Sequence, residues 1–215
     1  MTVISKPDTK PYAQFDDIEY AKCWAGIFEK AAEATRRINA ASLQSCGNFD
    51  LNRAFVGHSG GKDSVVVDFL ARAAYHERDR EFWDKPMKVV HNPKTTGPNK
   101  VHPLTREFLY ESARKRPIVF ASLEECVRAG YTTQIDGTRI SEFDRGDGRS
   151  TNFVRNGAIA SREELTCYVP NGLGGLNFIY PIYDWTDMDV WAFIDRFNVS
   201  FSDEYLIDIP LDTDC

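Results

Sequence analysis

The sequence of 215 residues predicts an α/β domain built on a mainly parallel sheet. Two observations carry this prediction. Short apolar runs alternate along the chain with longer stretches in which apolar residues recur at helical spacing. A turn rich in glycine and hydroxyl residues joins the first short run to a helical stretch. This alternation is typical of β-α-β units, in which helices connect parallel strands.

The N-terminal part of the chain predicts a polar arm followed by a long helix. Residues 1–17 show no clear periodicity, and we expect them to form the arm. Residues 18–43 place Cys23, Trp24, Ile27 and Ile38 on one helical face, which indicates an amphipathic helix packed on the sheet. We expect residues 18–215 to form a single domain.

The rest of the chain predicts strands and helices in alternation. Ser122 is expected to cap a short helix that ends near Gly130, and Thr186 is expected to cap a later helix whose first turn contains Asp187 and Asp189. Residues 171–175 are rich in glycine and read as a loop. The remaining expected elements are strands near 55–57, 87–91, 117–120 and 132–135, helices over 63–75 and 103–115, and a loop over 92–102.

Composition narrows the classes of function. The net charge is −6, which gives no general attraction to nucleic acid or to an anionic membrane. The five cysteines are scattered and form no C-x-x-C pair, so neither a zinc site nor an iron–sulfur cluster is predicted. Such cysteine usage, without an apolar leader or membrane span, favours the cytoplasm. We expect the acidic tail to lie in solvent; it contains Asp203, Glu204, Asp208, Asp212 and Asp214.

The turn at residues 59–64 has the properties of an anion-binding loop. Its sequence is Ser59-Gly60-Gly61-Lys62-Asp63-Ser64, directly between a strand and a helix. Glycines let backbone N–H groups approach an anion, and the first turn of a helix offers unpaired N–H donors. Lys62 adds a full positive charge, and the serines offer hydroxyls. Asp63 is expected to orient Lys62 or a metal-bound water, or simply to stabilise the first turn of the helix.

This loop differs from the common P-loop, which requires Ser or Thr after Gly-Lys and a glycine at the position of Val56. It resembles the pyrophosphate loop of the ATP pyrophosphatase superfamily, whose members cleave ATP between the α- and β-phosphates.

Two later segments complete a pattern. The segment 137–145 places Gly137 two residues before Arg139 and ends at Arg145; arginine suits the oxygens of phosphate or sulfate. The segment 181–191 reads Pro-Ile-Tyr-Asp-Trp-Thr-Asp-Met-Asp-Val-Trp. Together with the loop, these segments resemble the phosphoadenosine phosphosulfate (PAPS) reductase family. The resemblance implies an adenine nucleotide alpha hydrolase-like fold, a three-layer sandwich around a mainly parallel five-stranded sheet.

The resemblance implies an adenine nucleotide, ATP or PAPS, bound with Mg²⁺. Lys62, Asp63 and Arg139 are the residues expected to carry the chemistry, with Arg139 on the acceptor's anionic group or the α-phosphate. Adenine would lie near the ends of the first two strands. The residues expected to bind the nucleotide are Ser59, Gly60, Gly61, Lys62, Asp63, Ser64, Gly57, His91, Gly137, Arg139 and Arg145.

Three functions fit this resemblance. The retained Lys62 favours an ATP-using enzyme that adenylates an unknown acceptor and releases pyrophosphate. A thiol-dependent sulfonucleotide reductase is the alternative, but Cys215 stands at the end of the chain without the Gly and His that follow the catalytic cysteine in such enzymes. The third is a non-catalytic nucleotide-binding subunit or sensor that holds ATP and lets a partner act. The partners expected for the chain are a further subunit or a second copy of itself, as a homo-oligomer.

Overall fold

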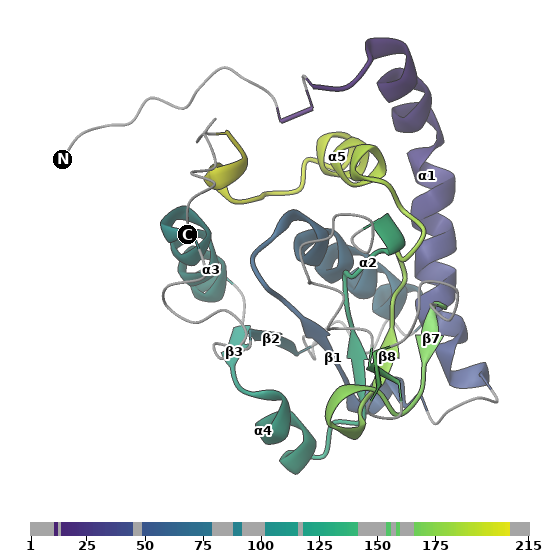
Figure 1. The fold of residues 1–215 in the computed structure, drawn as a ribbon, viewed down its shortest axis with the longest axis vertical. Helices are drawn as coiled ribbons and strands as arrows, with labels where there is room; N and C mark the ends of the chain where they lie inside the picture. The colour runs from purple at the N-terminus through teal and green to yellow at the C-terminus, as the bar shows by residue number, and fades with distance from the viewer. Residues whose placement is uncertain are drawn as a thin grey trace.

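The structure is a computed structural model that describes residues 11–12, 14–44, 49–78, 88–91, 102–115, 118–141, 154–155, 158–159 and 166–206. Helices and strands alternate through most of these residues, and the longest helix runs along one side of the sheet (Figure 1). Arg145 and Cys215, and the loop residues 92–101, lie outside the described part of the chain.

A six-stranded sheet forms the centre of the fold, in the order β3-β2-β1-β4-β8-β7. Its pairs are parallel except for β7 with β8, which is antiparallel. The chain passes from β1 to β2 and β3 on one side and then returns to place β4 on the other side of β1. The strands are β1 (Ala54–Gly57), β2 (Val89–His91), β3 (Ile118–Phe120), β4 (Thr133–Ile135), β7 (Tyr168–Val169) and β8 (Asn177–Ile179).

The first four strands confirm the sequence prediction within a residue or two, whereas the sheet has six strands and not the five expected. The additional strand, β7, has only two residues, too few to show the alternation by which strands are recognised. A separate two-stranded antiparallel pair consists of β5 (Val154–Arg155) and β6 (Ala158–Ile159).

Side-chain caps fix where several helices begin. Ser122 and Thr186 cap their helices, as predicted, and each also forms a capping box. The Asp16 side chain, which was not predicted as a cap, accepts from the N–H groups of Ile18 and Glu19. The helices are α1 (Asp17–Ala40), α2 (Lys62–Arg78), α3 (Pro103–Lys115), α4 (Leu123–Arg128) and α5 (Asp187–Arg196). Short 3₁₀ turns are η1 (Ala41–Leu43), η2 (Leu51–Arg53), η7 (Leu173–Gly175) and η8 (Asp203–Leu206).

Two hydrophobic clusters place the helices in layers. On one face of the sheet, α1 packs against α2 and α5, and this cluster includes Ile38, Leu70 and Phe193. The opposite face carries a smaller cluster in which Cys126 of α4 meets Phe55 and Phe178 of the sheet. The helices α1, α2 and α5 therefore form one packed layer on this face of the sheet, and this packing positions the start of α2 beside β1.

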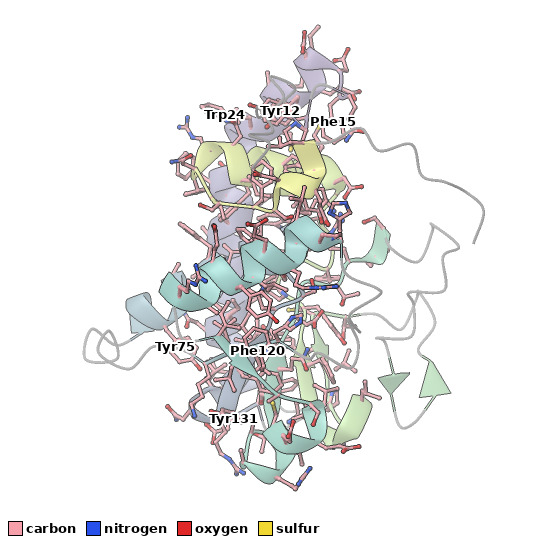
Figure 2. All side chains as sticks on the ribbon, turned by 90° about the vertical axis from the view of Figure 1, so that its left-hand side faces the viewer. Tyr12, Phe15, Trp24, Tyr75, Phe120 and Tyr131 are labelled. Carbon is pink, nitrogen blue, oxygen red and sulfur yellow. The ribbon has the colours of Figure 1, made fainter. Side chains whose placement is uncertain are left out.

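The two ends of the described chain both pack onto the domain. Tyr12 and Phe15 stack on Tyr20 of α1, and Figure 2 shows them near Trp24 at the upper end of the molecule. At the other end of the sequence, η8 packs on α3, where the yellow turn lies beside the teal helix (Figure 1). Among the described helices, none is both long and apolar enough to cross a membrane.

Candidate functional site

The glycine-rich loop lies where β1 ends and α2 begins, at the point where the sheet order reverses. Gly60 has φ of +90°, a conformation that residues with a Cβ rarely adopt. A Cβ at this position would also stand 2.7 Å from Thr105 Cγ2 and 2.9 Å from Leu109 Cγ of α3. Only glycine fits, so the loop turns tightly against α3.

Three amides in the middle of the loop, those of Gly60, Gly61 and Lys62, are hydrogen-bonded within the protein. The N–H of Gly60 donates to His58 Nδ1 at 3.1 Å, and the N–H of Gly61 donates to Ser59 Oγ at 3.2 Å. The N–H of Lys62 donates to the hydroxyl of Tyr205 at 3.2 Å. An anion that binds at these three amides must therefore replace their internal acceptors.

Two carboxylates hold the ammonium group of Lys62 beside the glycine-rich loop. Its Nζ lies 3.1 Å from Asp63 Oδ2 and 3.1 Å from Asp187 Oδ1, and the side chain is only 10% exposed. Asp187 belongs to the first turn of α5, so α5 fixes the ammonium group of a residue that begins α2.

Arg139 is fully buried beneath the same group of charges. Its Nη2 donates to Asp187 Oδ1 at 2.7 Å, and its Nη1 donates to Ser141 Oγ and to the Trp185 carbonyl. Its Nε lies 2.8 Å from Asp63 Oδ1, an ion pair without the angle of a hydrogen bond. The guanidinium group therefore joins the loop to α5 and lies behind Asp63 and Asp187.

The four side chains form a balanced network of two cations and two anions. Burial raises the pKa of Asp187, but the charges of Lys62 and Arg139 outweigh it and hold the pKa of this carboxyl well below its usual range. Asp187 is therefore ionised near neutral pH. Because Lys62 and Arg139 are already neutralised, an incoming anion must compete with Asp63 and Asp187 for them.

Close backbone contacts surround the network. A Cβ at Gly137 would stand 2.9 Å from the carbonyl carbon of Asp63, so glycine lets the end of β4 approach α2. Gly57 ends β1 beside the Gln134 side chain, whose Nε2 donates to Asp136 Oδ2 at 2.8 Å. Burial raises the pKa of Asp136 more than its hydrogen bonds from Thr138 and Gln134 lower it.

The remaining predicted residues, His91 and Ser64, contact the backbone or side chains of residues 58–61. His91 is buried, and its Nδ1 lies 2.8 Å from the carbonyl oxygen of His58. Ser64 Oγ donates to the Gly61 carbonyl at 2.8 Å and lies 3.3 Å from Ser59 Oγ. The structure thus brings all predicted residues within its described part to one region, around the start of α2.

Sequence reasoning did not select two residues of this region. The sequence interpretation of Asp187 is an acid in the first turn of a helix, favoured by the helix dipole, although it lies inside the third segment of the motif pattern. Tyr205 had no signal of its own. The expectation that Glu204 lies in solvent is wrong: it accepts a hydrogen bond from Thr105 and is partly buried against α3, because η8 folds back over the loop.

The described cysteines lie in surroundings that disfavour a thiolate. Burial raises the pKa of Cys23 and of Cys167 to about 12, and burial also raises the pKa of Cys126. All three are free thiols in the core or against it. At neutral pH they are protonated, so they are poor thiolate donors.

The sheet order and the loop at its reversal point define the fold class: the chain has the adenine nucleotide alpha hydrolase-like fold. No family model matches the sequence, and no curated protein matches it. Solved structures do.

FMN adenylyltransferase of Candida glabrata, in complex with FAD and inorganic pyrophosphate, aligns with a TM-score of 0.54 at 15% identity over 87% of this chain and 68% of that chain. The same enzyme in complex with ATP aligns with a TM-score of 0.53 at 14% identity over 87% and 67%. PAPS reductase of Candida auris, in complex with phosphate, has a TM-score of 0.49 at 12% identity over 89% and 91%. At these identities the two FMN adenylyltransferase structures show a shared fold and nothing more.

Proposed function

We propose that this chain binds ATP at the 59–64 loop and is an enzyme that transfers the adenylyl group to an acceptor, with release of pyrophosphate. The observation that carries the proposal is the loop itself. A glycine at positive φ turns the backbone at the carboxyl end of β1, and a buried lysine stands at its mouth. Fixed N–H groups at a helix N-terminus with an adjacent ammonium group suit a pyrophosphate unit.

Each residue then has a role that its position supports. Gly60, Gly61 and Lys62 offer their N–H groups to the β- and γ-phosphates, and Lys62 Nζ neutralises charge on them. Arg139 is fully buried and pairs with Asp63 and Asp187. Its main role is therefore to position these two carboxylates around Lys62. The acceptor's oxygen attacks the α-phosphorus, its proton leaves to solvent or a base, and the bond to the pyrophosphate oxygen breaks. Such a reaction depends chiefly on positioning and charge stabilisation.

The residues present also fit a Mg²⁺ ion brought by the triphosphate. Mg²⁺ is usually bound by one or two carboxylates together with phosphate oxygens and water, and Asp63 and Asp187 provide such carboxylates beside Lys62. Within the described residues no group of three or more metal-binding side chains exists, which suits an ion held mainly by the nucleotide. When bound, the ion would neutralise phosphate charge.

The fold neighbours agree with this proposal without identifying the acceptor. The Candida glabrata structures are of an FMN adenylyltransferase bound to ATP, and to FAD with inorganic pyrophosphate. A loop that suits a pyrophosphate unit in this chain fits the same class of reaction.

The test is equilibrium binding of Mg-ATP and of PAPS to the wild type and to Lys62→Ala. We expect the variant to lose ATP affinity by about 100-fold, because it removes a charge-assisted contact to the phosphates. The matched control is Lys30→Ala, since Lys30 also pairs with an acid of α5, Asp189, but lies on α1 away from the loop. It should bind ATP like the wild type.

Each result decides between the functions that fit the fold. Lys62-dependent ATP binding, followed by pyrophosphate release when acceptor alcohols or phosphates are added, supports the proposal. Preference for PAPS without dependence on Lys62 would mean a sulfonucleotide reductase, and sulfite release lost in Cys215→Ser would confirm that. Binding of neither nucleotide would overturn the nucleotide site.

A further inference from the structure

The C-terminal turn of the described chain lies against the loop. Residues 201–206, which include η8, pack on α3, and the hydroxyl of Tyr205 accepts the N–H of Lys62. The same hydroxyl lies 3.3 Å from where a Cβ on Gly61 would be. Tyr205 therefore touches the backbone of the two loop residues that precede and begin α2.

Tyr205 is firmly held in this position. Its ring packs edge-on against Trp191 of α5 with 5.3 Å between ring centroids, and Phe201 packs on the same tryptophan at 5.2 Å. Ser202 is fully buried, and its hydroxyl lies 3.0 Å from Thr105 Oγ1 of α3. The contact with the loop is thus the end of a packed segment and not a single mobile side chain.

The carboxylate of Glu204 lies close to the hydroxyl of Tyr205. Glu204 accepts from Thr105, and its charge helps raise the pKa of Tyr205, which burial raises most. The Tyr205 hydroxyl is therefore neutral, and it offers an oxygen to the Lys62 N–H in the place where a phosphate oxygen would otherwise be. A phosphate that took this N–H would approach both Glu204 and Asp63.

From these contacts we propose that Tyr205 competes with the phosphates of the nucleotide for the N–H of Lys62, and that residues 201–206 must shift when the nucleotide binds. The inference rests on the proposed function, because it names the residue that closes the same loop. The inference gives a role to residues 201–206, which lie outside the three motif segments. Only molecules in which residues 201–206 have moved away from the loop can bind the triphosphate. The apparent affinity is therefore the intrinsic affinity multiplied by the fraction of such molecules, and the turn lowers it.

The first test is Tyr205→Phe, which removes the competing oxygen and keeps the ring on Trp191. We expect Mg-ATP and inorganic pyrophosphate to bind about threefold to tenfold more tightly, the equivalent of one neutral hydrogen bond. Tyr110→Phe is the matched control, because Tyr110 is an exposed tyrosine of α3 that stacks on Phe120. Its affinities should equal those of the wild type.

A second measurement needs no variant. Hydrogen exchange of the wild type with and without Mg-ATP should show faster exchange for residues 201–206, where the N–H of Tyr205 donates to the Ser202 carbonyl, and slower exchange for the loop. Unchanged or weaker binding in Tyr205→Phe overturns the inference, as does stronger protection of residues 201–206 on binding. If the wild type binds ATP through Lys62, only the inference fails; if no variant binds ATP or pyrophosphate, the proposed function fails with it.

Discussion

Asp187 and Asp189 stand two residues apart in the first turn of α5 and serve different parts of the molecule. Asp187 contacts Lys62 and Arg139 beside the loop, and its side chain is 37% exposed. Asp189 is 3% exposed and accepts from Lys30 Nζ at 2.6 Å and from Cys23 Sγ at 2.9 Å, both on α1. Both acids suit the positive end of the helix dipole.

The difference between them lies in what surrounds each carboxylate. Asp189 also receives the N–H and hydroxyl of Thr186, so its capacity is filled by contacts that hold α5 on α1. Asp187 is more exposed and contacts the Lys62 ammonium group beside the loop as well as the buried Arg139. One helix turn therefore holds a structural ion pair and a pair that a ligand can replace.

The largest effect should come from the buried cation of the site. Arg139→Ala leaves Asp63 and Asp187 facing each other without their shared guanidinium group, and we expect it to lower the free energy of unfolding by about 3–5 kcal/mol. Arg37→Ala is the comparison: Arg37 forms a bidentate pair with Asp184 at 2.6 and 2.7 Å, but that acid is exposed. Urea denaturation should show a loss of only about 1 kcal/mol there. Equal losses of unfolding free energy in Arg139→Ala and Arg37→Ala would contradict the distinction between a buried and an exposed ion pair.

A smaller effect should separate Asp187 from Asp189. Asp187→Asn keeps the shape but removes a carboxylate that competes with phosphate for Lys62, so we expect inorganic pyrophosphate without Mg²⁺ to bind about threefold more tightly. Asp189→Asn should leave the affinity unchanged and lower the melting temperature, since it weakens the capping box of α5. Titration calorimetry and thermal melts measure both quantities. A loss of affinity in Asp187→Asn would mean that positioning of Lys62 outweighs competition.

The smallest effect concerns acid stability. The pKa of Asp187 and of Asp189 is lowered in the folded protein, so each contributes stability above the unfolded value of about 4 that is lost as the pH falls through the folded value. Stability should therefore decrease between about pH 5 and pH 2, less steeply in either Asn variant. Asp136 acts in the opposite direction, because its pKa is raised. Asp136→Asn should therefore gain stability relative to the wild type as the pH rises above about 4.

Much of the fold follows from local signals in the sequence. The capping residues Ser122 and Thr186 and the positions of the first four strands needed only short windows of sequence, because caps and apolar runs act within a few residues. Strands β7 and β8 were not located: β7 has two residues, and β8 begins with Asn177. Their places were decided by pairing with distant strands, since β8 pairs with β4 inside the sheet and β7 pairs with β8 at its edge.

The sequence by itself determined the loop, since Gly60, Gly61 and Lys62 between a strand and a helix specify both its backbone and its charge. Only the tertiary structure decided what surrounds it. Arg139 reaches Asp187 across 48 residues, and Lys62 meets Tyr205 across 143. The physical reason is that a loop conformation depends on adjacent residues, whereas the partners of a buried charge depend on which distant elements pack over it.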